Sequence, residues 1–127
     1  TRVLRLVRVR TARRQPLQCT EVYLPPDVAA LIDVAQLDDT PLLSVIEAAG
    51  RPFAQGEQEL TAVIASADVA QRLAIAPGAP VLRVNRVVYD ATGLPIQYLI
   101  GHYTPTHYRY RMKMSRTGGA TRVWIAD

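Results

Sequence analysis

Cysteine and large apolar aromatic residues are scarce in this sequence. The single cysteine, Cys19, excludes an internal disulfide and a cysteine-based zinc site, and we expect it to be a small buried apolar residue. Phe and Trp occur once each, against six Tyr, so Val, Leu, Ile and Ala must build most of the core. Because a tyrosine side chain ends in a hydroxyl, these residues suit the lining of a wet pocket better than a dry interior.

Long apolar runs are also missing. No stretch reaches the roughly 18 apolar residues that span a membrane, and no signal-peptide pattern opens the chain, so we expect a cytoplasmic protein without membrane contact. The 127 residues, 49% of them apolar, fit one globular domain, residues 1–127. The chain starts without Met inside an expected strand, so we expect it to be part of something longer.

The sequence lacks the common catalytic motifs. Neither a G-x-S-x-G nucleophile elbow nor a glycine-rich phosphate loop occurs. His102 and His107 are five residues apart, which places them on opposite faces of a strand and argues against a shared metal. Glu57 and Glu59 share a strand face that could line a pocket or simply meet solvent. We therefore predict no catalytic site, no metal and no cofactor.

Positive charge is concentrated in two segments, residues 2–14 and 109–116, and the formal net charge is +4. Arginine and lysine on edge strands discourage pairing with other sheets, which is the ordinary explanation of such segments. Anion binding is the main alternative, and direct DNA contact is the least favoured one.

Apolar periodicity and turn residues predict an α+β domain in which helices pack on a central antiparallel sheet. Turn residues Arg13–Gln15 and Asp90–Gly93 predict two hairpins. Strands are expected at residues 2–10, 17–24, 52–64, 81–89, 95–103 and 107–115, helices at 26–36, 41–49 and 67–73, and a tail at 117–127.

Several motifs occur together in a characteristic order. They are VLRLVRVR followed by PLQCTEVYLPP, then TPLLSVIEAAG, then ADVAQRLAIAPGAPVLRVNRVVYD at 67–90 and ATGLPIQYLIGHYTPTHYRYRM at 91–112. With this order and spacing, residues 2–112 resemble the UTRA domain, the effector-binding domain of HutC-type GntR transcription regulators, which is related in fold to chorismate lyase.

The resemblance implies a chorismate-lyase-like architecture with a pocket between sheet and helices, and a homodimer. It also implies that a winged helix-turn-helix domain and a further strand precede this segment, so that DNA is bound only through that separate domain. The partner of the segment itself would be a small polar or anionic effector.

Seven residues are the candidate ligand contacts that the resemblance implies for the first and last hairpins. They are Arg8, Arg10, Glu21, Tyr23, Tyr98, His102 and Tyr108. Arginine offers a donor fork for carboxylate or phosphate, glutamate accepts from hydroxyl or amino groups, and tyrosine adds a flat face with a polar tip. Relatives usually carry Arg-x-Asp-Arg-Tyr where this chain has Thr104 to Tyr108, and only the tyrosine is retained. The effector is therefore expected to be less acidic than those of such relatives, or to be held by other residues.

Each candidate also has an ordinary structural explanation, as a solvated strand residue, an ion-pair partner or a core residue. Two other functions stay open at this point. One is an enzyme of the chorismate-lyase type, and the other is a dimerisation domain that binds no ligand. A basic nucleic-acid module is the least favoured function.

Overall fold

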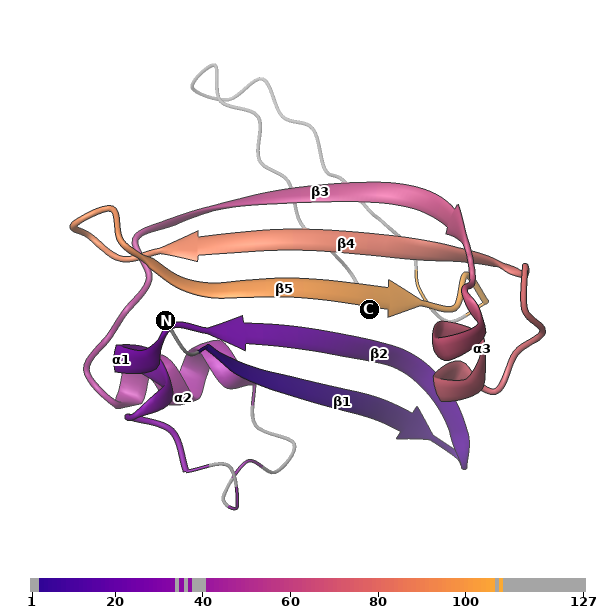
Figure 1. Cartoon of the computed structure of the whole chain (residues 1–127), viewed down its shortest axis with the longest axis horizontal. Coiled ribbons are helices and arrows are strands. Elements are labelled where there is room, and N and C mark those ends of the chain that lie inside the picture. Colours follow the sequence, from indigo (N-terminus) through magenta and orange to yellow (C-terminus); the bar gives the residue numbers. More distant parts are fainter. Residues whose placement is uncertain (1–2, 34, 36, 38–40, 107, 109–127) are drawn as a thin grey trace, which may run out of the picture. The chain divides into compact units, whose positions relative to one another are not determined.

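The computed structural model describes residues 3–33, 35, 37, 41–106 and 108, and the expected strand at 107–115 and the tail therefore lie almost wholly outside the described residues. Five strands form one antiparallel sheet in the order β1-β2-β5-β4-β3, which confirms the α+β prediction (Figure 1). The elements are β1 (Leu4–Ala12), β2 (Gln15–Leu24), α1 (Pro26–Ala29), α2 (Leu42–Ala48), β3 (Gln55–Ile64), α3 (Ala67–Leu73), β4 (Pro80–Tyr89) and β5 (Pro95–Tyr103).

The chain divides into two compact units, and all five strands contribute residues to both. Unit 1 comprises Thr1–Arg8, Thr20–Thr61 and Arg83–Gly101, and unit 2 comprises Val9–Cys19, Ala62–Leu82 and His102–Asp127.

The core of unit 1 is aliphatic, as the scarcity of Phe and Trp predicts. Its buried side chains come from the strands β2, β4 and β5 and from the helical region between β2 and β3. They include Val22, Leu24, Val28, Ile46, Val84, Val88 and Ile96. Burying a Val, Leu or Ile side chain contributes about 1.5–3 kcal/mol, so this set accounts for much of the stability of the unit.

The helix α1 is much shorter than predicted. It begins at Pro26, as the helix-starting role of proline predicts, but it ends at Ala29 instead of continuing to residue 36. The N–H groups of Leu31 and Ile32 bond to carbonyls three residues earlier, at 3.0 and 3.2 Å, so the helix tightens into turns at its end. The apolar spacing that predicted a longer helix continues after Ala29, and among the described residues of this segment Val28 and Ile32 are buried.

Unit 2 is organised around α3, whose limits agree with the prediction. Ser66 caps this helix, since its Oγ accepts from the N–H of Val69 at 3.3 Å. The helix buries Val69 and Leu73 in a cluster with Cys19, which is only 2% exposed and packs as the small apolar residue that we expected.

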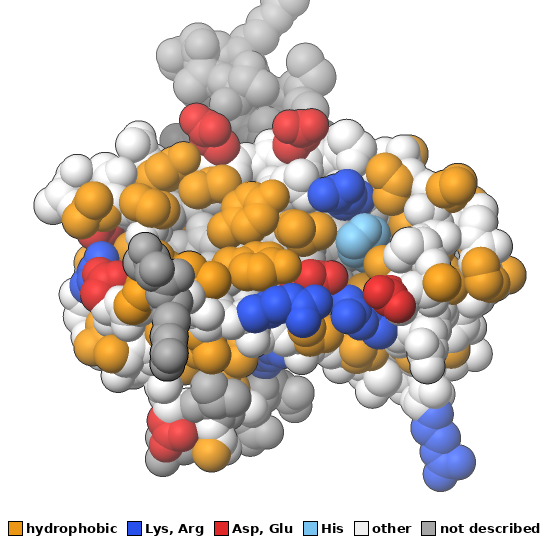
Figure 2. Space-filling model, in the orientation of Figure 1, with side chains coloured by type: hydrophobic (Ala, Val, Ile, Leu, Met, Phe, Trp, Pro, Cys, Tyr) orange, Lys and Arg blue, Asp and Glu red, His pale blue; other side chains and the backbone are white. Residues whose placement is uncertain are grey.

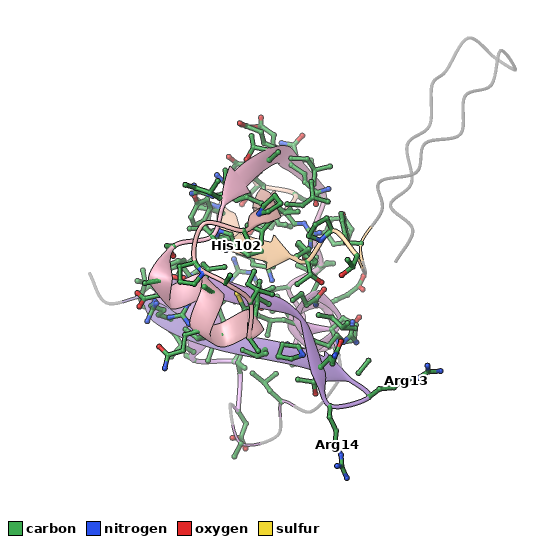
Figure 3. The ribbon with its side chains drawn as sticks, turned by 90° about the vertical axis from the view of Figure 1, so that its right-hand side faces the viewer. Arg13, Arg14 and His102 are labelled. Carbon is green, nitrogen blue, oxygen red and sulfur yellow. The ribbon has the colours of Figure 1, made fainter. Side chains whose placement is uncertain are left out.

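The turn between β1 and β2 is conformationally strained. Arg13 and Arg14 have φ angles of 50° and 65°, in the left-handed region, and the two residues form a two-residue turn of the type that asparagine and glycine favour. Figure 3 shows both arginine side chains extending away from the ribbon. The sequence predicted a polar turn here but not its strain, because arginine carries a β-carbon that disfavours this conformation.

We expect the double substitution Arg13→Asn, Arg14→Gly to stabilise the protein by about 1 kcal/mol, because both replacements tolerate positive φ. Urea unfolding measures the change. The control Arg13→Ala, Arg14→Ala removes the same charges but keeps the β-carbons, and should give no gain. Equal stabilities of the two variants would show that charge and not backbone strain governs this turn.

Asp90 organises the turn between β4 and β5. Its Oδ1 accepts from the Thr92 hydroxyl at 2.6 Å and from the N–H groups of Thr92 and Leu94 at 2.9 and 3.1 Å. Arg51 donates at 3.1 Å to the other carboxylate oxygen of Asp90 and at 2.8 Å to Asp27, so it joins this turn to the first turn of α1. The Thr92 hydrogen bond is the largest cause that lowers the pKa of Asp90 to about 2.

A folded-state pKa below the ordinary value of about 3.9 stabilises the fold above that value, and the contribution is lost as the pH falls toward 2. We therefore expect carbon-detected NMR titration to find the Asp90 carboxyl still ionised at pH 3. Thr92→Ala should raise the pKa of Asp90 by removing the shortest bond. A parent protein in which Asp90 titrates in the ordinary range would refute this account of the turn.

Candidate functional site

A polar cluster lies in unit 1 on the strands β1, β2 and β5. The guanidinium of Arg5 donates to Oε2 of Glu21 at 3.1 Å, and the Tyr23 hydroxyl donates to the same oxygen at 3.0 Å. The ring of Tyr23 in turn contacts the ring of Tyr98, with centroids 6.0 Å apart and planes tilted by 39°. We call these four residues the polar cluster.

The polar cluster is accessible to solvent. The side chain of Arg5 is 48% exposed and that of Glu21 is 21% exposed. Figure 2 shows basic and acidic side chains next to an apolar patch on this face of the sheet. The Tyr23 hydroxyl and then Glu21 raise the pKa of Arg5 above its ordinary value, so the guanidinium is charged at every physiological pH.

This arrangement suits ligand binding better than it suits stabilisation. An exposed ion pair contributes at most about 1 kcal/mol to folding, because water screens it and two side chains must be ordered. A carboxylate, a guanidinium and two tyrosines in one place nevertheless present acceptors, donors and flat apolar faces to a small polar molecule.

Three of the seven residues predicted from the sequence meet in the polar cluster, namely Glu21, Tyr23 and Tyr98. Arg5, which pairs with Glu21, was not among them. The family resemblance implied Arg8 and Arg10 on the same strand instead, and the register between β1 and β2, which would have singled out Arg5, cannot be read from the sequence. The only available signal was that Arg5 also belongs to the arginine-rich strand.

The contacts that define the polar cluster do not involve the other four candidates. Arg8 is half-buried on β1, and Arg10 is exposed on the part of β1 that belongs to unit 2. His102 lies half-buried at the end of β5 in unit 2 (Figure 3). Tyr108 in the same unit is buried and packs against Tyr103, with ring centroids 4.5 Å apart. Their roles in binding stay predictions.

Gln97 is a feature that sequence reasoning missed. It is 2% exposed, and its Oε1 has no hydrogen-bond partner among the described residues. It neighbours Tyr98 on β5, so it points to the opposite face of the sheet. An unpaired buried carbonyl costs about 1–3 kcal/mol. No pattern in the sequence reveals it, because glutamine on a strand is usually solvated.

We expect Gln97→Met to raise the free energy of unfolding by about 1–2 kcal/mol, since methionine has a similar shape and no buried polar oxygen to satisfy. Urea unfolding measures this. Gln97→Glu is the opposite case, because it would bury a carboxylate, and should destabilise the fold. A Gln97→Met variant less stable than the parent would show that the Oε1 is satisfied.

Two carboxylates that the sequence singled out lie on β3. Glu57 and Glu59 are exposed on β3, which favours the solvated face over a pocket wall. In the part of the chain that the structure describes, no group of three or more His, Cys, Asp or Glu could hold a metal ion. His107 lies outside the described residues.

The chain belongs to the UTRA domain family, whose pattern residues 1–109 match. An HTH-type transcriptional regulator of Mycobacterium tuberculosis is 34% identical over 114 residues, which cover 87% of this chain and 42% of that relative. The chain thus spans less than half the length of the regulator. The resemblance to the UTRA domain, inferred from the sequence motifs, is confirmed.

Solved structures of similar proteins agree with the fold. A GntR-family transcriptional regulator from Enterococcus faecalis superposes with a TM-score of 0.78 at 26% identity, over 87% of this chain and 80% of that one. The ligand-binding domain of a protein described as a GntR-family regulator, from Bordetella bronchiseptica, gives 0.79 at 27% identity, over 89% and 73%. Among the described residues, no helix is long and apolar enough to cross a membrane.

Proposed function

We propose that this chain is the effector-binding domain of a GntR-type transcription regulator, and that its polar cluster contacts the effector. The observation that carries the proposal is membership of the UTRA family over residues 1–109. The polar cluster supports it, because the described part of unit 1 offers there a charged donor, an acceptor and two aromatic faces within reach of solvent.

The proposed effector is a small polar molecule that carries both donor and acceptor groups. The Arg5 guanidinium can donate to a carboxylate, phosphate or carbonyl, and Glu21 can accept from a hydroxyl or amino group. Tyr23 holds Glu21 in place through its hydroxyl and leaves its ring to pack on the apolar part of the molecule. Arg8, Arg10, His102 and Tyr108 remain further proposed contacts.

Regulation would follow from differential binding. An effector that binds one arrangement of the domain better than another shifts the population of that arrangement. We propose that the shift is transmitted in a cytoplasmic homodimer to separate winged helix-turn-helix domains, since paired DNA-binding domains read paired half-sites. The DNA contact belongs to those domains and not to this one.

The described relatives favour a regulator over a lyase. All three are named as transcriptional regulators, and none is named as an enzyme. We propose that the chain has no catalytic activity. Release of pyruvate from chorismate on incubation with the purified protein would contradict this.

A thermal-stability screen against sugar phosphates, amino-acid breakdown products and small aromatic acids tests the proposal. A ligand that binds the folded state stabilises it and so raises the melting temperature. At a ligand concentration of a hundred times the Kd, the added stability is about 2.7 kcal/mol. We expect at least one such compound, and we expect Glu21→Gln to weaken it at least about tenfold by removing the charged acceptor.

Glu59→Gln is the matched control, because it removes an exposed carboxylate from β3 in the same unit and should leave the affinity unchanged. Equal losses of affinity in Glu21→Gln and Glu59→Gln would indicate a general effect of the net charge. A ligand that binds Glu21→Gln and Tyr23→Phe as tightly as the parent would place the effector outside the polar cluster.

A further inference from the structure

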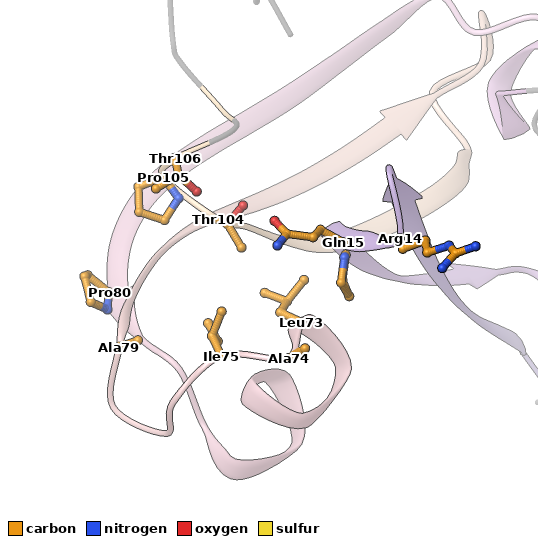
Figure 4. A pocket seen from close by; sticks show the side chains of 11 residues that line it. Arg14, Gln15, Leu73, Ala74, Ile75, Ala79, Pro80, Thr104, Pro105 and Thr106 are labelled. Carbon is orange, nitrogen blue, oxygen red and sulfur yellow. The ribbon is translucent and has the colours of Figure 1, made fainter.

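Unit 2 contains a cavity of about 480 Å³, open to solvent on one side, that the polar cluster does not share (Figure 4). Its walls are the end of α3, the start of β4, the β1–β2 turn and the segment that follows β5. Small-molecule pockets usually measure about 300–1,000 Å³, so the cavity has the size of a ligand site.

Most of the wall is apolar and stiff. Leu73 and Ile75 point from the end of α3 toward Thr104 on the facing wall (Figure 4). Pro80 and Pro105 close one side. Leu73 is also a member of the buried cluster that holds α3, so this wall is part of the core of the unit. Proline rings and a core leucine do not collapse into an empty space easily, which keeps the cavity open.

The polar groups in the cavity wall are neutral. They are the amide of Gln15 and the hydroxyls of Thr104 and Thr106. Arg14 is the one charged residue of the lining, and Figure 4 shows its guanidinium pointing away from the cavity. Because no carboxylate is among the described residues of the lining and the guanidinium faces outward, these residues favour neither a cation nor an anion, but they can exchange hydrogen bonds with a ligand.

Two turns shape the cavity wall. Arg14, with a φ angle of 65°, belongs to the two-residue turn between β1 and β2, and Ala74, with a φ angle of 55°, is the C-terminal cap of α3. The positions of both wall segments are therefore fixed by the hairpin and by the helix end.

We propose that this cavity is a second binding site, for a small, uncharged and largely apolar molecule with one hydrogen-bonding group such as a primary amide. Its apolar body packs between Leu73, Ile75 and the prolines, while its polar group reaches Gln15 and Thr106. The site goes beyond the proposed effector function, since all of its lining residues belong to unit 2 and the polar cluster belongs to unit 1.

Three probes of equal shape and different charge test the site, namely benzamide, benzoate and benzamidine. Methyl NMR of Leu73 and Ile75 follows each titration of the whole chain. We expect saturable shifts with benzamide, and at least about fivefold weaker binding of both charged analogues, because a neutral apolar wall does not compensate the loss of their hydration. The absence of saturable benzamide shifts, or equal binding of all three probes, would overturn the proposal.

Ala79→Phe should fill the cavity and weaken benzamide at least about tenfold, whereas Ala76→Phe, at an exposed position outside the lining, should not. Thr106→Val is a second test, because it changes an exposed residue and should leave the fold intact. It should weaken the binding of benzamide, and it can be measured even if Ala79→Phe does not fold. Unchanged affinity in Thr106→Val and in folded Ala79→Phe contradicts the site. Glu21→Gln should leave benzamide binding intact, so failure here is distinguishable from failure of the proposed effector site.

Discussion

The pairing of β2 with β5 is the interaction on which the rest of the structure depends. It joins the hairpin of β1 and β2 to the hairpin of β4 and β5, which are far apart in the sequence, and it puts β5 in the middle of the sheet. At one end of this pairing the N–H of Thr104 bonds to the carbonyl of Leu17 at 3.2 Å. In unit 1 the same pair of strands brings Tyr23 to Tyr98.

The proposed function follows from this pairing. Glu21 and Tyr23 belong to the first hairpin, and Tyr98 belongs to the last, so the polar cluster exists only when the two hairpins are joined. A molecule that touches both hairpins would be sensitive to their relative arrangement. This is the property that an effector-binding domain needs if binding is to bias one conformation over another.

Several residues lower the stability of the folded state relative to an obvious replacement. Arg13 and Arg14 adopt left-handed angles where asparagine and glycine would fit, and Gln97 buries an oxygen that no described residue satisfies. Proteins keep such costs where function needs the geometry or where selection has no reason to remove them.

Much of the fold was predictable from local patterns. The hairpin strands carry β-branched residues and end in turn residues, and Ser66 followed by an apolar helical stretch marks α3. The length of α1 was predicted wrongly, because apolar spacing continues after the helix has tightened into turns.

The candidate site was predictable only in part. Glu21, Tyr23 and Tyr98 were found through the family resemblance, which carries the order of motifs across the chain. Arg5 was missed because cross-strand neighbours depend on register, which sequence spacing does not determine. Gln97 and the cavity of unit 2 depend on burial and on packing between distant segments, and no local pattern encodes these.

The proposed function depends on contact between the effector and the polar cluster of unit 1. Carbon-labelled tyrosine NMR tests it most directly, with the compound that raises the melting temperature added to the whole chain. The account predicts that the ring signals of Tyr23 and Tyr98 shift in proportion to binding, while that of Tyr89, on β4, stays in place. Saturated binding with unshifted Tyr23 and Tyr98 signals would contradict it.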